Sequence, residues 1–251
     1  MDLITLLSFN YFFPSIQSLW YIPFHEFDKA NVCIFHCQES EMSGATDYIE
    51  NIRYPRTSFR FRRQVNADID RLLAELRKHV DKGLHLGAGS TKLEGLINCD
   101  LFNPEADLKT DAKDLSMFAD GSIDLIESHH MIEHLSFADT ESALKEWHRV
   151  LCQRGLLVVS CPDLFRVFLK WLRYSAIYPL FPRQEKLDYI IKMLVGPQQH
   201  EGQFHRNAFD SRRMSQLLSR HGFSVEFSFS PYSERPTPSL LVIARKTGPS
   251  Q

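Results

Sequence analysis

A short apolar segment that runs directly into two glycines places the strongest constraint on how this chain folds. Residues 84–86, Leu-His-Leu, are followed by Gly87, Ala88 and Gly89. Glycine lets the backbone approach a ligand closely and adopt dihedral angles that other residues resist. Asp100 ends the next apolar segment, where a carboxylate can accept hydrogen bonds from the two hydroxyls of a ribose. The pattern predicts a nucleoside site at the ends of two neighbouring strands.

Strands and helices alternate through the rest of the chain. Strands are expected at residues 83–86, 96–99, 123–126, 156–161, 223–229 and 240–244, and helices at about 66–80, 138–151 and 211–221. Gly155 is expected to end the middle helix. The unbroken apolar run from Leu156 to Cys161 is typical of a strand buried on both faces of a parallel sheet. The alternation predicts an α/β fold.

A chain of 251 residues favours one domain with additions. We expect an irregular N-terminal extension over residues 1–60 and a folded domain over residues 61–251, with an insertion at about 163–207. The first 24 residues are rich in apolar side chains, but Asp2 stands where a signal peptide is basic, and Pro14 interrupts the run. Neither a targeting segment nor a membrane span is expected there.

Charge and cysteine content indicate which binding partners and which cellular compartment to expect. The 29 Lys and Arg residues nearly balance the 31 Asp and Glu residues, which gives a net charge of −2 and favours no nucleic-acid partner. The 5 cysteines are an odd number, as expected of reduced thiols in a cytoplasmic protein. Cys33 and Cys37 lack a second pair with zinc-finger spacing, so no metal is expected there.

The glycine turn also suits dinucleotide-binding enzymes, but two features argue against that class. Lys92 stands where their third glycine is found, and the interval from Gly89 to Leu96 is too short for the helix that binds pyrophosphate. A nucleoside cofactor without phosphates needs no such helix. S-adenosylmethionine is a cofactor of this kind.

The order of motifs resembles the class I S-adenosylmethionine-dependent methyltransferases. The likeness is carried by LHLGAGS, INCD, TDAKDLSMFADGSIDLIESHHMIEHL and ALKEWHRVLCQRGLLVVSCPD, strongly over residues 82–163 and more weakly over 205–246. It is greatest to the group with EHL after the fourth strand, whose members are predicted to act on small molecules or glycans. The resemblance implies a Rossmann-like, mostly parallel seven-stranded sheet with an antiparallel C-terminal hairpin. It also implies methyl transfer from S-adenosyl-L-methionine to oxygen or nitrogen of a small molecule or sugar.

The resemblance also implies, by position, a set of cofactor-binding residues: His85, Gly87, Ala88, Gly89, Asp100, Leu101, Asp111, Ala112 and Ser128. Residues 87–89 would pack against the methionine moiety, and Asp100 would hold the ribose. Leu101 would lie against the adenine, whose amino group Asp111 would bind. Ser128 and His129 would line the methyl-transfer end.

Two positions depart from the family's commonest pattern. His85 stands where many members carry an acid, and Thr91 where many carry a further glycine. Methyl transfer is an in-line displacement, so alignment supplies most of the acceleration, and a general base is needed only for a weakly acidic hydroxyl. The candidate bases are His129, His130, His134, His200 and His205. We favour His129 and His205 as the catalytic pair.

Three alternatives remain open from the sequence. One is a protein that binds the cofactor without catalysis. Another is a zinc metallohydrolase, because His130, Glu133 and His134 match the H-x-x-E-H pattern in which two histidines bind the metal and the glutamate activates water. The third concerns the aromatic insertion, which either forms a core of paired helices or covers an acceptor as an apolar lid.

Overall fold

The computed structural model describes residues 59–177, 184–232 and 238–248, all within one compact unit. The predicted extension over residues 1–60 therefore lies almost entirely outside the described residues, as do Cys33 and Cys37. Cys99, Cys152 and Cys161 are free thiols. Across the three described ranges, no helix is both long enough and apolar enough to cross a membrane.

A seven-stranded sheet forms the centre of this unit, with the strand order β3-β2-β1-β4-β5-β7-β6. The strands are β1 (Gly83–Leu86), β2 (Ile97–Asp100), β3 (Leu108–Lys109), β4 (Ile123–His129), β5 (Leu151–Pro162), β6 (Phe223–Tyr232) and β7 (Ser239–Lys246). Among them, β7 runs antiparallel to both of its neighbours, and the remaining pairs are parallel. The predicted mostly parallel sheet with a C-terminal hairpin is confirmed.

Strand β1 is the point at which the strand order reverses. Its Leu84 pairs with Ile97 of β2 on one side and with Ile126 of β4 on the other, all in parallel. In open α/β sheets, ligands bind outside the carboxyl ends of the strands that flank such a reversal. The topology therefore places the glycine turn after β1 where a ligand is expected.

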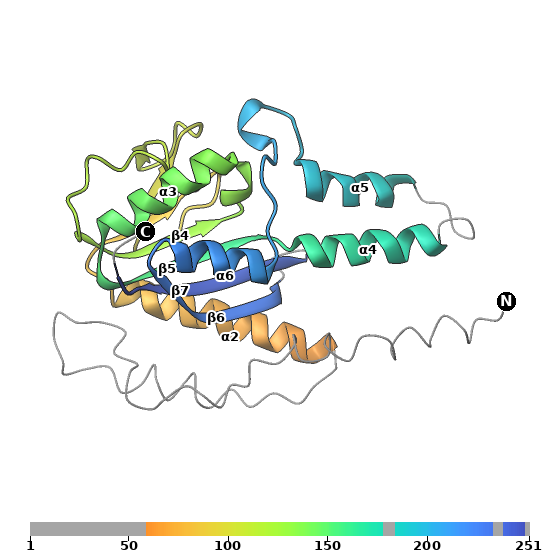
Figure 1. Ribbon diagram of the computed structural model, residues 1–251, viewed down its shortest axis with the longest axis horizontal. Coiled ribbons are helices and arrows are strands. Elements are labelled where there is room, and N and C mark those ends of the chain that lie inside the picture. The colour runs from red at the N-terminus through yellow and green to blue at the C-terminus, as the bar shows by residue number, and fades with distance from the viewer. Residues whose placement is uncertain (1–58, 178–183, 233–237, 249–251) are drawn as a thin grey trace. The chain divides into compact units, whose positions relative to one another are not determined.

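Helices cover both faces of the sheet (Figure 1). Helix α2 (Phe59–Lys78) lies on one face, and α3 (Phe137–Val150) and α6 (Ser211–Arg220) lie on the other. The side chain of Ser136 caps α3 by accepting a hydrogen bond from the Asp139 N–H, and that of Asp210 caps α6 through Arg213. The apolar faces of α3 and α6 join the strands in one continuous core.

Several element boundaries differ from the sequence prediction. Helix α2 begins at Phe59, well before the predicted start near residue 66. Gly155 does not end α3; the chain turns directly from helix to strand at Leu151, and Gly155 lies inside β5. Strand β4 continues to His129, three residues beyond the predicted end at Ile126. The short strand β3 was not predicted.

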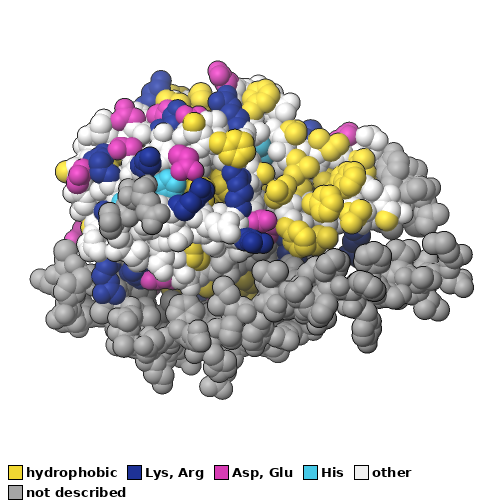
Figure 2. Space-filling view, viewed as in Figure 1, with side chains coloured by type: hydrophobic (Ala, Val, Ile, Leu, Met, Phe, Trp, Pro, Cys, Tyr) yellow, Lys and Arg dark blue, Asp and Glu magenta, His cyan; other side chains and the backbone are white. Residues whose placement is uncertain are grey.

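The insertion forms two paired helices, α4 (Leu164–Ile177) and α5 (Gln184–Val195), followed by the 3₁₀ helix η5 (Glu201–Gln203). Val167 of α4 packs with Ile190 and Met193 of α5 in a small core of its own, as one of the two interpretations predicted. Many other apolar side chains of the pair remain exposed, and Figure 2 shows them gathered over α4 and α5. The pair thus has a core, but that core leaves much apolar surface uncovered.

A buried ion pair ties α2 to the centre of the sheet. The Arg77 guanidinium donates two hydrogen bonds of 2.8 Å, one to each carboxylate oxygen of Glu127 on β4. His129 Nε2 donates to the same carboxylate at 2.9 Å. Burial alone raises the pKa of Glu127, but the hydrogen bonds from His129 and Arg77 outweigh it and leave the pKa below its ordinary value. Glu127 is therefore a buried anion that depends on these partners.

Replacing Arg77 with methionine is expected to lower the free energy of unfolding by roughly 3–5 kcal/mol, because the buried Glu127 loses its cation while most of the alkyl packing remains. Denaturant unfolding measures the change. Lys78→Met on the same helix is the control, since its pair with Glu75 is exposed and contributes at most about 1 kcal/mol. Equal losses in the two variants would contradict a special role for the buried pair.

Candidate active site

The turn after β1 requires glycine for two separate reasons. Gly87 and Gly89 have φ angles of +73° and +52°, a backbone conformation that favours glycine. A Cβ atom at Gly87 would also stand only 2.2 Å from the Cγ atom of Met131. Around Gly89 no atom lies within 4 Å of such a Cβ, so this glycine faces open space. The turn leaves room for a ligand beside Gly89 and none behind Gly87.

Asp100 is held firmly at the end of β2. Its Oδ1 accepts hydrogen bonds of 2.7 Å from the backbone N–H groups of Phe102 and Asn103. Its Oδ2 accepts one hydrogen bond, also of 2.7 Å, from the N–H of Gly89. The Asn103 side chain returns to the carbonyl of Gly89 and closes the loop. The carboxylate is thus fixed in orientation, and Oδ2 keeps accepting capacity for a ligand hydroxyl.

A second aspartate enters from the segment after β3. Asp111 accepts a hydrogen bond of 3.0 Å from the N–H of Lys113, whose ammonium group lies 3.6 Å from the other oxygen of Asp111. The buried Trp147 of α3 donates its indole N–H to the carbonyl of Ala112 at 2.8 Å. This long-range bond fixes the loop that presents Asp111.

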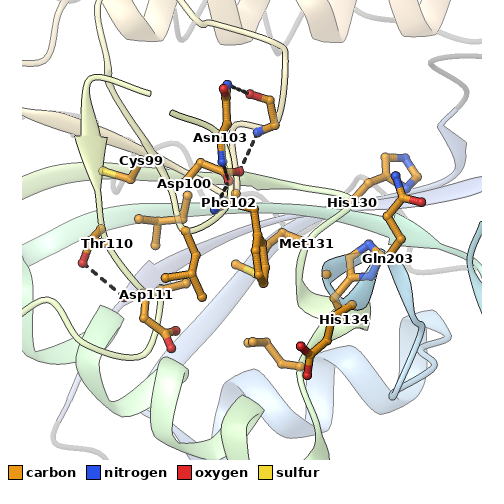
Figure 3. Close-up of a pocket in the computed structure, with 18 of the residues that line it drawn as sticks. Cys99, Asp100, Phe102, Asn103, Thr110, Asp111, His130, Met131, His134 and Gln203 are labelled. Atoms are coloured by element: carbon orange, nitrogen blue, oxygen red, sulfur yellow. Dashed lines mark hydrogen bonds between the residues drawn. The ribbon is translucent and has the colours of Figure 1, made fainter. Parts of the chain in front are cut away.

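These elements surround a cavity of about 880 Å³ (Figure 3). Six of the residues predicted to bind the cofactor line it: Gly87, Gly89, Asp100, Leu101, Asp111 and Ala112. In the view of Figure 3, Asp100 and Asp111 lie on one side, His130 and His134 on the other, and Met131 between them. The two aspartates and the glycine turn thus line one common cavity.

The other predicted site residues lie elsewhere. His85, Ala88 and His129 line a smaller neighbouring cavity of about 410 Å³. Ser128 is fully buried within β4. The cause is the longer β4: the cavity is reached after His129, so His130 and Met131 occupy the wall where Ser128 and His129 were expected.

Both ring nitrogens of His129 are already engaged within the protein. Its Nε2 donates to Glu127, and its Nδ1 accepts from the hydroxyl of Ser160 at 2.9 Å. His85 is also buried, and its Nδ1 lies 3.0 Å from the side-chain oxygen of Asn98. Burial lowers the pKa of His85. Neither imidazole presents a lone pair to the large cavity.

His205, the other predicted base, follows η5 at the end of the insertion. Its Nδ1 donates to the carbonyl of Met193 at 3.1 Å, and its ring lies edge-on to that of His134, with the centroids 4.8 Å apart. Burial lowers the pKa of His205. His134 lines the large cavity, so His205 is one side chain removed from it.

Sequence reasoning missed several cavity residues. Phe102 and Asn103 follow Asp100, and Gln203 and Arg206 come from the insertion; His200, one of the candidate bases, also lines the cavity. A Cβ atom at Gly202 would lie 2.6 Å from the Phe102 ring, so the insertion closes on that ring. The cluster of histidines after residue 199 was the available signal, but only the fold shows that it returns to the cavity.

The zinc-hydrolase interpretation needs its two histidines on one face of a continuous helix. The structure instead has a single 3₁₀ turn, η4 (Ile132–His134), and His130 before it has a φ of +52° at the end of β4. The H-x-x-E-H pattern therefore does not lie on a helix. Around Glu133, the potential metal ligands are His134 and His205, and not His130 and His134.

The comparison with protein families identifies this architecture. Residues 92–159, from the end of the glycine loop through most of β5, match the family model described as a methyltransferase domain. The strand order, with β7 inserted antiparallel between β5 and β6, is that of the same fold. This match and the sheet topology both support a methyltransferase domain of class I. S-adenosylmethionine is the cofactor expected of such a domain.

Solved structures similar to this methyltransferase share little sequence with it. A SAM-dependent methyltransferase from Methanosarcina mazei is 18% identical, with a TM-score of 0.47 over 66% of this chain and 92% of that one. The 1,6-didemethyltoxoflavin-N1-methyltransferase of Burkholderia thailandensis is 13% identical, with a TM-score of 0.47 over 78% of this chain and 94% of that one. Magnesium protoporphyrin IX methyltransferase from Synechocystis PCC 6803 is 13% identical, with a TM-score of 0.45 over 82% and 95%. No protein of curated function matches the chain.

Gly87→Ala is expected to reduce the free energy of unfolding by about 2–4 kcal/mol, because strain at positive φ adds to the clash with Met131. Gly89→Ala, with similar φ but open space, should lose only about 1 kcal/mol. Adding Met131→Ala to Gly87→Ala should cost less than the sum of the two single losses, since it opens room for the methyl group. Strict additivity in denaturant unfolding would rule out the contact as the cause.

Proposed function

We propose that this methyltransferase transfers the methyl group of S-adenosylmethionine to an oxygen or nitrogen atom of a small molecule or sugar. The observation that carries the proposal is the convergence of Gly89, Asp100 and Asp111 on one cavity of about 880 Å³. Small-molecule sites span roughly 300–1,000 Å³, so this space suits a nucleoside cofactor beside a compact acceptor. The near-zero net charge supports an acceptor other than a polyanion.

The geometry of the cradle fits the cofactor without rearrangement. In this proposal, the ribose hydroxyls donate to Oδ2 of Asp100, which accepts only one hydrogen bond within the described structure. The methionine portion lies along the turn, where the open space beside Gly89 admits it. The carboxylate of Asp100 needs no reorientation on binding, because its backbone partners already hold it.

The adenine is proposed to bind between the loop after β2 and the loop after β3. Leu101 and Phe102 line the cavity and are 41% and 59% exposed, which is unusual for apolar side chains unless a ligand covers them. Asp111, held by the N–H of Lys113, would accept a hydrogen bond from the adenine amino group. An apolar slot with one polar group matches the chemistry of adenine.

When bound, the sulfonium supplies the methyl carbon: the acceptor lone pair forms the new bond to that carbon as the carbon–sulfur bond breaks, and its electron pair goes to sulfur. The protein contributes alignment and the exclusion of water. The acceptor would enter on the side formed by His134, Gln203 and Arg206, opposite the aspartates. Of the two predicted bases, only His205 lies on this side, behind His134.

Asp111→Asn is expected to weaken binding of S-adenosylhomocysteine by roughly 10- to 100-fold, the value of a hydrogen bond to a charged group. Isothermal titration calorimetry measures it. Asp114→Asn is the matched control, since Asp114 lies in the same loop but bonds to the N–H of Ser116 and not to the cavity. Equal affinities in all three proteins would contradict the proposed adenine site.

Turnover of labelled methyl donor over a panel of hydroxyl and amine acceptors then tests catalysis. Methyl transfer to a small acceptor, lost together with cofactor affinity in Asp111→Asn, is the expected result. Tight binding of S-adenosylhomocysteine without transfer to any member of a broad panel would instead favour a protein that only binds the cofactor.

A further inference from the structure

Three potential metal ligands meet on the acceptor side of the cavity. Glu133, His134 and His205 each offer one ligand atom, and these atoms lie within 4.8 Å of one another. The first two belong to η4, whereas His205 comes from the end of the insertion. His134 also lines the cavity itself (Figure 3). The cluster therefore borders the space in which an acceptor would bind.

Backbone hydrogen bonds hold the two segments together. The carbonyl of Glu133 accepts from the N–H groups of Arg206 and Asn207, at 2.8 and 3.0 Å. The N–H of His205 donates to the carbonyl of Val195 at 3.1 Å, at the end of α5. These bonds do not involve the three ligand side chains. The grouping is thus set by the main chain and would persist if one side chain were changed.

The carboxylate of Glu133 is buried with weaker partners than those of Glu127. Glu133 is 2% exposed, and neither carboxylate oxygen takes part in a hydrogen bond of acceptable geometry. The nearest nitrogen is Nδ1 of His130, 3.3 Å from Oε1. By contrast, buried Glu127 receives three hydrogen bonds from Arg77 and His129. A buried carboxylate without such donors is expected to face a cation.

Both imidazoles form a hydrogen bond to a backbone carbonyl through Nδ1. Nδ1 of His134 lies 3.2 Å from the carbonyl of Phe204, and Nδ1 of His205 lies 3.1 Å from the carbonyl of Met193. A carbonyl only accepts hydrogen bonds, so each Nδ1 carries the proton and each Nε2 bears a lone pair. Metal-bound histidines usually donate their other ring N–H to a carbonyl or carboxylate in this way.

We propose that Glu133, His134 and His205 bind a divalent transition-metal ion. Two imidazoles and one carboxylate suit zinc and its first-row neighbours better than calcium or magnesium, which prefer oxygen ligands. Three protein ligands also leave coordination positions open, as in catalytic rather than structural metal sites.

If the proposed methyltransferase function holds, the ion favours a hydroxyl as the acceptor. A divalent cation beside the cavity stabilises the negative charge that develops on the acceptor oxygen as its proton leaves to solvent. That oxygen would form a bond to the methyl carbon as the carbon–sulfur bond breaks, with the electron pair of the broken bond remaining on sulfur. The ion would thus supply the activation that neither ring nitrogen of His129 is free to provide.

The test is calorimetric titration of the full-length, tag-free and chelator-treated protein with Zn²⁺ and with Co²⁺. We expect one ion per chain and, for Co²⁺, visible absorption of a nitrogen- and oxygen-coordinated ion. Glu133→Gln and His205→Ala should each weaken binding by at least about tenfold. His79→Ala is the control, because His79 follows α2, pairs with Glu75 at the exposed surface and should not affect the affinity. Glu133→Gln keeps the side-chain shape and removes a buried charge, so it should fold.

Absence of binding for both ions, or equal affinity in the wild type, Glu133→Gln and His205→Ala, would overturn the metal site. Titration with S-adenosylhomocysteine in the presence of chelator separates this from the broader proposal. Retained affinity for S-adenosylhomocysteine without metal binding would contradict the metal site and leave the proposed cofactor site standing. If the wild type binds the metal but loses affinity for S-adenosylhomocysteine when the metal is removed, the proposed cofactor site does not bind its ligand independently of the metal.

Discussion

The contact between Gly87 and Met131 is the constraint on which the site depends. It fixes how closely the turn after β1 approaches the segment after β4, since a single added methyl group would overlap the Met131 side chain. On one side of this contact, Gly89 and Asp100 form the proposed cradle for the nucleoside. On the other side, two residues beyond Met131, Glu133 begins the proposed metal cluster. Packing at Met131 therefore fixes the position of the proposed metal cluster relative to the proposed nucleoside cradle.

The two buried glutamates show how the same side chain takes different roles in one fold. Glu127 is neutralised within the protein by Arg77 and His129, and its role is to join α2 to the sheet. Glu133 is also buried, but its oxygens accept no hydrogen bond of good geometry, and its ion-pair contact is with His130 at 3.3 Å. Burying a carboxylate without well-formed hydrogen bonds costs free energy. Such a residue beside a cavity therefore indicates a functional site.

Much of the fold was predictable because it depends on local pattern. The apolar strands, the glycine turn and the helix that begins at Ser211 all appear close to where periodicity and turn chemistry predicted them. The error in β4 arose because Glu127 reads as a polar strand end, whereas its charge is satisfied by Arg77, 50 residues earlier in the chain. A local sequence pattern does not reveal such a distant partner. Because the strand was predicted to end three residues too early, Ser128 and His129 were expected in the cavity wall.

The acceptor side was less predictable for a related reason. His205 approaches Glu133 only because the insertion folds into α4 and α5 and then returns to η4 by backbone hydrogen bonds. The spacing of H-x-x-E-H drew attention to His130 as a ligand, but its strained backbone at the strand end and the distant His205 change the grouping to Glu133, His134 and His205.

Two different parts of the chain form the cavity wall, and this affects how the specificity of such an enzyme can change. The aspartate side comes from the loops of the core sheet, whereas Gln203 and Arg206 come from the inserted segment. Substitutions or length changes between α4 and η5 can reshape what the enzyme accepts while the grip on its methyl donor stays intact. Close relatives that share the donor site are therefore poor guides to one another's substrates.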